Sequence, residues 1–221
     1  MATERMFSRS KVLNRIGIYN DFELVGAAFE HCTLAQFEHP FETIVRDAAF
    51  SNCRATGPCF VHGVKFENIA VRDFAADEVV NFAACVFRNV VLEGAIGPFI
   101  TTPAHPSLGG ERRADISRLM VDFYRDVDWA IDISRGEFAD ATLPMIPGHL
   151  VRRDPETQFL VKRAPLEESS QAELPLIGKS YRRRFKSSPF DSFVAVAPRL
   201  SDSFEEIYVQ LSELRELGLA E

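Results

Sequence analysis

The sequence predicts a mainly β protein with additional α structure: a short β-solenoid, followed by an α/β region with a capping helix, a β-hairpin and a C-terminal helix. A five-residue pattern centred on phenylalanine recurs between Ala27 and Gly94 and predicts the solenoid. Helical and strand periodicities replace it after residue 100. The chain has 221 residues, 46% of them hydrophobic, so it can bury a sizeable core. We therefore expect a solenoid over residues 1–100 and an α/β region over residues 101–221 that packs against it.

Each repeat unit begins with a small apolar residue, carries Phe, Leu, Val or Ala third, and is mostly polar at its last two positions. Clear units are residues 27–31, 48–52, 64–68, 80–84 and 85–89. Apolar positions two apart that recur every five residues fit neither a helix nor an uninterrupted strand, whereas a short strand with a turn at each corner fits them.

The spacing of the central phenylalanines predicts the size of a coil. The step is 21 residues from Phe29 to Phe50 and from Phe66 to Phe87, and 16 residues from Phe50 to Phe66. This predicts about four coils, each of about four units and one of them a unit short, in which the phenylalanine of one coil stacks on that of the previous coil.

These units resemble the pentapeptide-repeat family over about 75 residues. The resemblance implies a right-handed quadrilateral β-helix in which the first and third residues of each unit point inward, and it implies protein partners. This chain uses Phe more than Leu and breaks the pattern at residues 37–47 and 58–63. Some family members imitate the shape and charge of duplex DNA. That role needs a long acidic rod, whereas about four coils rise only ~20 Å.

The cysteines are expected to be structural. Cys32, Cys53 and Cys85 occupy the first position of a unit, where a small buried side chain is needed, and only Cys59 lies outside this register. The gaps between them are 20, 5 and 25 residues, with no histidine in a recognisable pattern, whereas zinc sites use pairs of closely spaced ligands. We expect no metal site and no cofactor.

The second region begins with a boundary loop and a helix. Residues 101–110 contain two prolines and two glycines and predict the loop. The helix is indicated by apolar residues at steps of three and four, which are Ile116, Leu119, Met120, Phe123 and Val127. A solenoid exposes an apolar cross-section at each end, so we expect this helix to cover a solenoid end or a neighbouring sheet. Residues 136–143 resemble the five-residue repeat pattern again. They predict a strand that rejoins the solenoid or begins a sheet.

Further strands, a loop and a helix are expected toward the C-terminus. Residues 150–153 and 158–162 flank Asp154-Pro155, a turn signal that predicts a β-hairpin. Residues 164–175 predict a mobile loop, and residues 192–197 a buried strand. The last helix would begin at a capping box on Ser203 and end at Gly218; its apolar stripe is Phe204, Ile207, Leu211, Leu214 and Leu217.

The strongest candidate binding segment is basic. It consists of Tyr181, Arg182, Arg183, Arg184 and Lys186, a set of cations interleaved with aromatic residues that could contact an acidic protein surface or phosphate groups. Residues 149–199 hold ten basic and six acidic side chains, whereas residues 21–99 hold five basic and eleven acidic ones. The two regions could therefore dock on one another or on a charged partner.

An alternative polar site lies at the predicted hairpin. His149, Arg152, Arg153 and Asp154 are close in sequence and could bind an anion or position a general base. A further acidic group, Asp122, Asp126, Asp128 and Asp132, has helical spacing but lacks the glycine of a calcium loop. A solvated polar edge and a solvated helix face are the structural alternatives for these two groups.

Function is constrained mainly by what the sequence lacks. It contains no nucleophile-elbow, phosphate-loop, zinc-protease or dinucleotide motif. We expect a non-enzymatic protein-interaction or inhibitor-type protein that uses the solenoid as a rigid display surface. The alternative is an enzyme of unassigned class with a dispersed site at the junction of the two regions, including His149, Arg152, Asp154 or the group from Asp126 to Asp132.

Partner and location follow from charge and hydropathy. The net charge of −7 argues against nucleic acid and leaves another protein, which could itself be charged, as the expected partner. No apolar run reaches the length of a signal peptide or a membrane span, which predicts a cytoplasmic, bacterial-type protein without membrane contact. The oligomeric state stays open, and a dimer through a solenoid end is one alternative.

Overall fold

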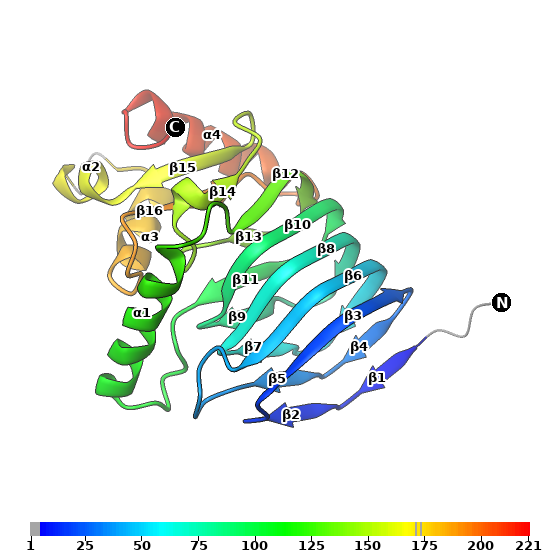
Figure 1. Ribbon diagram of the computed structural model, residues 1–221. Coiled ribbons are helices and arrows are strands. Elements are labelled where there is room, and N and C mark those ends of the chain that lie inside the picture. Colours follow the sequence, from blue (N-terminus) through cyan, green and yellow to red (C-terminus); the bar gives the residue numbers. More distant parts are fainter. Residues whose placement is uncertain (1–4, 171, 173) are drawn as a thin grey trace.

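The computed structural model describes residues 5–170, 172 and 174–221, and two eight-stranded sheets dominate this part of the chain (Figure 1). The first sheet contains, in spatial order, β1 (Met6–Ser8), β4 (Ala28–Glu30), β6 (Thr43–Thr56), β8 (Val64–Ala76), β10 (Val86–Ile96), β12 (Ile131–Phe138) and β14 (Val151–Arg152), with β3 (Gly17–Val25) also paired to β6. The second contains β15 (Gln158–Lys162), β16 (Ser192–Val196), β13 (Ala141–Thr142), β11 (Phe99–Thr102), β9 (Val80–Ala83), β7 (Phe60–His62), β5 (Thr33–Ala35) and β2 (Lys11–Leu13). The predicted mainly β class is confirmed.

Strands β1 to β14 form the parallel stack, a name we use for these paired strands together. From β4 to β14, consecutive strands alternate between the two sheets, and every strand pair within the stack is parallel. The antiparallel pairs, β13 with β16 and β15 with β16, lie at the end farther from the N-terminus. The sequence pattern therefore builds a layered structure in which strands β4 to β14 each lie on a strand from an earlier part of the chain.

The repeat step sets the register in the middle of the stack. Phe66 lies opposite Phe87, and their rings stack with centroids 5.5 Å apart, as the 21-residue step predicts. Phe29, in contrast, lies opposite Ala55 rather than Phe50. Residues 36–42 lengthen the connection between β5 and β6, which shifts the register by five residues and leaves Phe50 opposite Leu24.

The long strands turn at residues with positive φ. Asp47 and Asn52 adopt this conformation within β6, and Asn68 and Asp73 do so within β8, so the turns recur five residues apart. Asn and Asp tolerate the left-handed region because their short polar side chains bond locally. Here they also bond between layers, since Asn68 Nδ2 donates to Asp47 Oδ1 at 2.8 Å and Asn89 Nδ2 to Asn68 Oδ1 at 3.0 Å.

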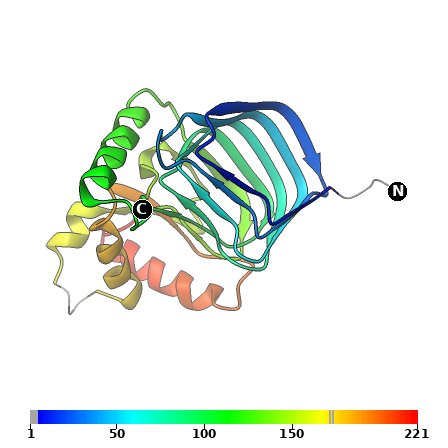
Figure 2. The ribbon, with the colours of Figure 1, turned by 90° about the horizontal axis from the view of Figure 1, so that it is seen from below.

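The predicted amphipathic helix exists as α1 (Gly110–Tyr124), but it does not cap the end of the stack. It lies along one flank, where Tyr124 contacts the backbone of Phe87 and Arg112 reaches the carbonyls of Phe37 and Glu38 (Figures 1 and 2). The sheets continue past α1 because β12 and β13 pair with β10 and β11. The strand predicted over residues 136–143 thus rejoins the stack.

The predicted β-hairpin is wrong. Strand β14 pairs in parallel with β12, whereas β15 pairs antiparallel with β16 in the other sheet. The turn at Asp154 therefore carries the chain from one sheet to the other instead of folding it back on itself. Its side chain explains why the turn signal was strong, because Asp154 Oδ1 and Oδ2 accept hydrogen bonds from the N–H of Glu156 and the hydroxyl of Thr157.

A second apolar core joins the helices to β15 and β16. The helices are α2 (Arg163–Glu168), α3 (Leu176–Phe185) and α4 (Phe204–Glu216), and a short 3-10 turn covers Gly148–Leu150. Helix α2 occupies part of the segment predicted as a mobile loop. The buried strand and the last helix are confirmed, and Gly218 ends α4 with a φ of +72°. The predicted capping box is absent, since the Ser203 side chain makes no capping hydrogen bond.

The two predicted regions share a core. Buried residues in one continuous apolar cluster run from Val45 in β6 to Val196 in β16, and they include Ile116 and Met120 of α1. Figure 2 shows the helices gathered on one side of the molecule, with the parallel stack extending from them toward the N-terminus.

Candidate binding cleft between α1 and α3

The predicted basic segment lies on the last two turns of α3, and burial divides it. Tyr181 is buried against Phe193, with ring centroids 5.2 Å apart, and burial raises its pKa. Arg182 is partly buried and donates from Nε to the carbonyl of Leu166 at 2.9 Å. These two residues stabilise the fold and are not free to contact a partner.

The remaining residues of the segment face outward to different degrees. Arg183 and Lys186 are exposed, whereas Arg184 is partly buried beside Asp140. Desolvation raises the pKa of the Asp140 carboxyl, and the positive charge of Arg184 partly offsets this rise. The structure therefore leaves Arg183 and Lys186 as the accessible cations of the predicted set.

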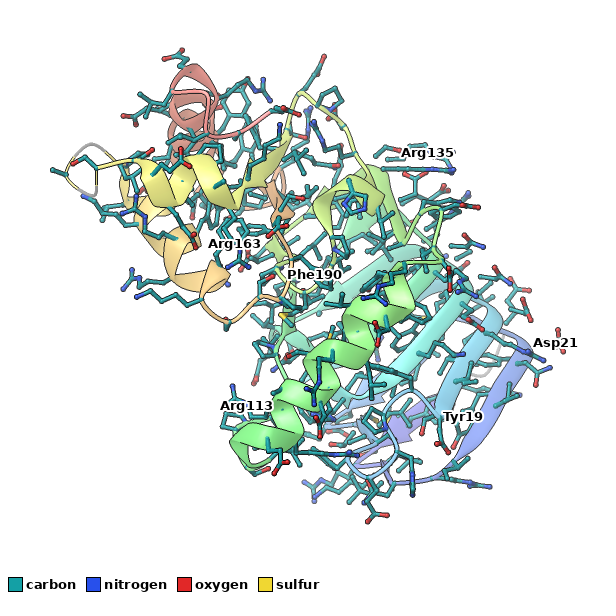
Figure 3. All side chains as sticks on the ribbon, turned by 60° about the vertical axis from the view of Figure 1, so that its left-hand side comes forward. Tyr19, Asp21, Arg113, Arg135, Arg163 and Phe190 are labelled. Carbon is teal, nitrogen blue, oxygen red and sulfur yellow. The ribbon has the colours of Figure 1, made fainter. Side chains whose placement is uncertain are left out.

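A single arginine holds the end of α3 in place. The Arg163 guanidinium donates hydrogen bonds to the carbonyls of Phe185, Ser188 and Phe190, at 3.0, 2.7 and 2.7 Å. Terminal helix carbonyls lack intrahelical partners, so such bonds stabilise both the helix end and the chain that follows it. Figure 3 shows Arg163 and Phe190 in this region, between the helices and the parallel stack. Arg163 thus positions the segment that carries Lys186.

Across from Lys186 lies the first half of α1. Its residues Gly110, Arg113, Ala114 and Ser117 follow a helical spacing of three and four and so share one face, while Ile116, Met120 and Tyr124 are buried in the core. Between α1 and the end of α3 is a cleft of about 250 Å³, which we call the α1–α3 cleft. Its lining is Pro103, Ala104, Gly110, Arg113, Ala114, Ser117, Lys186 and Ser187.

The α1–α3 cleft is positively charged. Arg113 and Lys186 line it, and none of the described residues in its lining is acidic. The Arg113 Nε is buried and has no hydrogen-bond partner among the described residues. Of the acidic side chains of α1, Asp115 pairs with Arg118 and Asp122 with Arg125, whereas Glu111 in the first turn has no ion-pair partner among the described residues. The two cations that line the cleft can bind a carboxylate or a phosphate group. The hydroxyls of Ser117 and Ser187 already donate to the carbonyls of Arg113 and Arg184, each at 3.0 Å.

The alternative polar residues do not gather into a site. The Arg152 guanidinium lies over the Trp129 ring, 4.2 Å from its centroid, and Arg153 Nη1 donates to the Gln158 carbonyl at 2.8 Å. Burial lowers the pKa of Arg153. Asp154 is held within its own turn, and His149 is exposed. Arg152, Arg153 and Asp154 each have a structural contact. None of them lines the α1–α3 cleft, and neither does His149.

The acidic side chains of Asp122, Asp126, Asp128 and Asp132 also do not converge on one site. Asp132 accepts hydrogen bonds from the N–H and hydroxyl of Ser134, while Asp126 and Asp128 are exposed. Across the described part of the chain, no cluster of three or more His, Cys, Asp or Glu side chains could hold a metal ion. No helix within that same part is long and apolar enough to cross a membrane.

A second, shallower cleft of about 520 Å³ lies where the strands of the first sheet turn. Its lining includes Arg54, Asp73 and Leu200 together with small side chains. Asp73 Oδ1 already accepts a hydrogen bond from the N–H of Ala95 at 2.9 Å, and Arg54 has an interaction partner. This cleft therefore offers fewer free groups for a ligand than the α1–α3 cleft.

Searches against protein-family models, curated proteins and solved structures found no match. The assignment of the α1–α3 cleft as a candidate binding site therefore depends on its geometry alone. Sequence reasoning found Lys186 but missed Arg113, Ser117 and Ser187, because these residues meet only after α1 packs along the flank of the stack. The available signal was the spacing of Gly110, Arg113, Ala114 and Ser117 on one helix face.

Proposed function

We propose that this protein is a non-enzymatic protein-interaction or inhibitor-type protein that binds an acidic partner at the α1–α3 cleft. In this proposal the parallel stack is a short right-handed β-solenoid of about four coils, similar to pentapeptide-repeat proteins, and serves as a rigid support. The helices, which lie outside the repeats, supply the specific contacts. The single observation that carries the proposal is the pair of cations Arg113 and Lys186, which line one cleft and have no acidic partner among the described residues.

The distribution of ion pairs supports this choice. Two exposed cations on the outer face of the stack, Arg72 and Arg135, already pair with Glu93. Arg113, Arg183 and Lys186 have no such partner among the described residues. Unpaired like charges around a concave surface attract an oppositely charged surface and accelerate its association.

The lining of the α1–α3 cleft also favours binding over catalysis. A hydrolase or proton-transfer enzyme needs a nucleophile or a general base positioned by a second group. None of the described lining residues is His, Asp, Glu or Cys, and the hydroxyl of Ser187 donates to the backbone carbonyl of Arg184 at 3.0 Å. Binding an anionic group is the chemistry that these side chains support.

Co-purification from cells that naturally make the protein tests the proposal. The tagged full-length chain is compared with Arg113→Ala/Lys186→Ala and with the matched control Arg118→Ala/Arg125→Ala. Both variants lose two positive charges, but the control changes α1 side chains that pair with neighbouring aspartates. We expect an acidic protein to be retained by the wild type and the control and lost from the first variant. Equal retention by all three would refute the proposal.

A further inference from the structure

The end of the parallel stack nearest the N-terminus presents unpaired strand edges. Strands β1 and β2 are the terminal strands of their sheets, and β3 pairs only with β6 among the described strands. Each of the three therefore pairs on one side only. Figure 1 shows them in blue at the end of the stack opposite the helices. Unpaired strand edges invite pairing with another chain unless charge, proline or a cover prevents it.

This end is also apolar. It carries five of the eleven large hydrophobic side chains that are exposed in the described part of the chain, and these five are Met6, Leu13, Ile16, Ile18 and Val25. In addition, Phe7, Tyr19 and Phe22 belong to the core clusters but are only partly buried. Along β1 and β3 these partly buried aromatic residues alternate with the exposed ones, so a further layer on this end would cover Phe7, Tyr19 and Phe22.

Charge is divided along the same edge. Arg5, Arg9, Lys11 and Arg15 precede β3, and none of them pairs with an acidic side chain among the described residues. Asp21 and Glu23 lie on β3 itself, and Figure 3 shows Asp21 at this end of the molecule. The edge thus has a basic part, along β1 and β2, and an acidic part, along β3.

We propose that a second copy of this chain covers this end, head to head around a two-fold axis. Such an axis runs the facing strands in opposite directions, so they pair antiparallel, and it places the basic part of each copy against the acidic part of the other. This interface is separate from the α1–α3 cleft and does not depend on the proposed function.

Sedimentation velocity of the full chain over a range of concentrations tests this interface. Two variants reverse the two parts of the edge: Arg9→Asp/Lys11→Glu makes it acidic, and Asp21→Arg/Glu23→Lys makes it basic. We expect the wild type to be a dimer and the dissociation constant of each variant to rise at least ~10-fold. Mixing the two variants in equal amounts should restore a dimer, because an acidic edge then faces a basic one.

Circular dichroism and thermal unfolding of each variant establish that it folds. A wild type that stays monomeric throughout, or that forms open-ended aggregates, would overturn the proposal. Wild-type-like dimerisation of both variants would overturn it too, because the interface would then lie elsewhere. Loss of partner binding in the α1–α3 variant leaves the sedimentation result unchanged, so the two proposals fail separately.

Discussion

The buried imidazole of His62 links two distant segments of the chain to each other. Its Nε2 accepts a hydrogen bond from the backbone N–H of His105 at 3.2 Å, and its Nδ1 lies 3.1 Å from the carbonyl of Gln36. Both contacts are satisfied when Nδ1 carries the proton and the ring is neutral. His62 thereby holds the loop that precedes α1 against the parallel stack.

This neutral imidazole predicts a loss of stability in acid. Burial lowers the pKa of His62 below its ordinary value of 6.5, and the nearby His105 contributes in the same direction. The stabilising contribution is therefore complete above the ordinary value and is lost as the pH falls through the lowered one. Urea unfolding from about pH 7.5 to about pH 5 should show a larger decrease in unfolding free energy for the wild type than for His62→Gln. Parallel pH profiles would contradict this assignment.

Removal of a buried hydroxyl should lower the unfolding free energy at Tyr124 but not at Tyr19. Tyr124 Oη accepts a hydrogen bond from the N–H of Phe87 at 3.2 Å, so Tyr124→Phe leaves a buried donor unsatisfied and should cost about 1–3 kcal/mol. Tyr19 Oη is buried without a partner among the described residues, so Tyr19→Phe should be neutral or stabilising. Thermal or urea unfolding of both variants measures the difference, and an equal loss in both would show that Tyr124 gains little from its bond.

Close packing between layers predicts unequal effects at two glycines. Gly26 and Gly63 both have positive φ, so alanine is strained at each by roughly 1 kcal/mol. A Cβ at Gly26 would meet open space, whereas at Gly63 it would lie 2.2 Å from the backbone oxygen of Gln36. Gly63→Ala should therefore lower the unfolding free energy clearly more than Gly26→Ala. Similar losses would mean that these layers can separate at little cost.

The cysteines should differ in reactivity. Burial raises the pKa of Cys85 to about 12, so its thiol stays protonated near neutral pH, whereas Cys32 is partly exposed. The thiolate is the reactive form. Alkylation of the native protein followed by mass spectrometry should modify Cys32 first and Cys85 only after unfolding. Rapid native labelling of Cys85, with a Cys85→Ala variant to assign the peptide, would contradict its burial.

The sequence predicted the parts of the fold that depend on local spacing. The 21-residue step placed Phe66 opposite Phe87, and the apolar stripe located most of α1. The predicted stacking of Phe29 on Phe50 was wrong, because residues 36–42 insert a loop that no five-residue pattern describes. The hairpin predicted at Asp154 was also wrong, since a turn signal specifies that the chain bends but not which strand it meets next.

The candidate cleft was less predictable than the fold, because it depends on tertiary contacts. The basic segment of α3 was visible in the sequence, but burial of Tyr181 and the backbone bonds of Arg182 removed part of it from the surface. Arg113 joined Lys186 only through the docking of α1 along the flank. Charge clusters in a sequence therefore identify a surface, while packing decides which of its charges remain available.

The most direct test of the account is an NMR titration of the isotopically labelled full chain with a polyglutamate peptide at low salt. We expect the largest amide shift changes at Gly110, Arg113, Ser117, Lys186 and Ser187, which line the α1–α3 cleft. We also expect these changes to weaken as salt screens the charges and to disappear in Arg113→Ala/Lys186→Ala. Shift changes confined to the outer face of the parallel stack, or an unchanged titration of the double variant, would contradict the claim that this cleft binds an acidic partner.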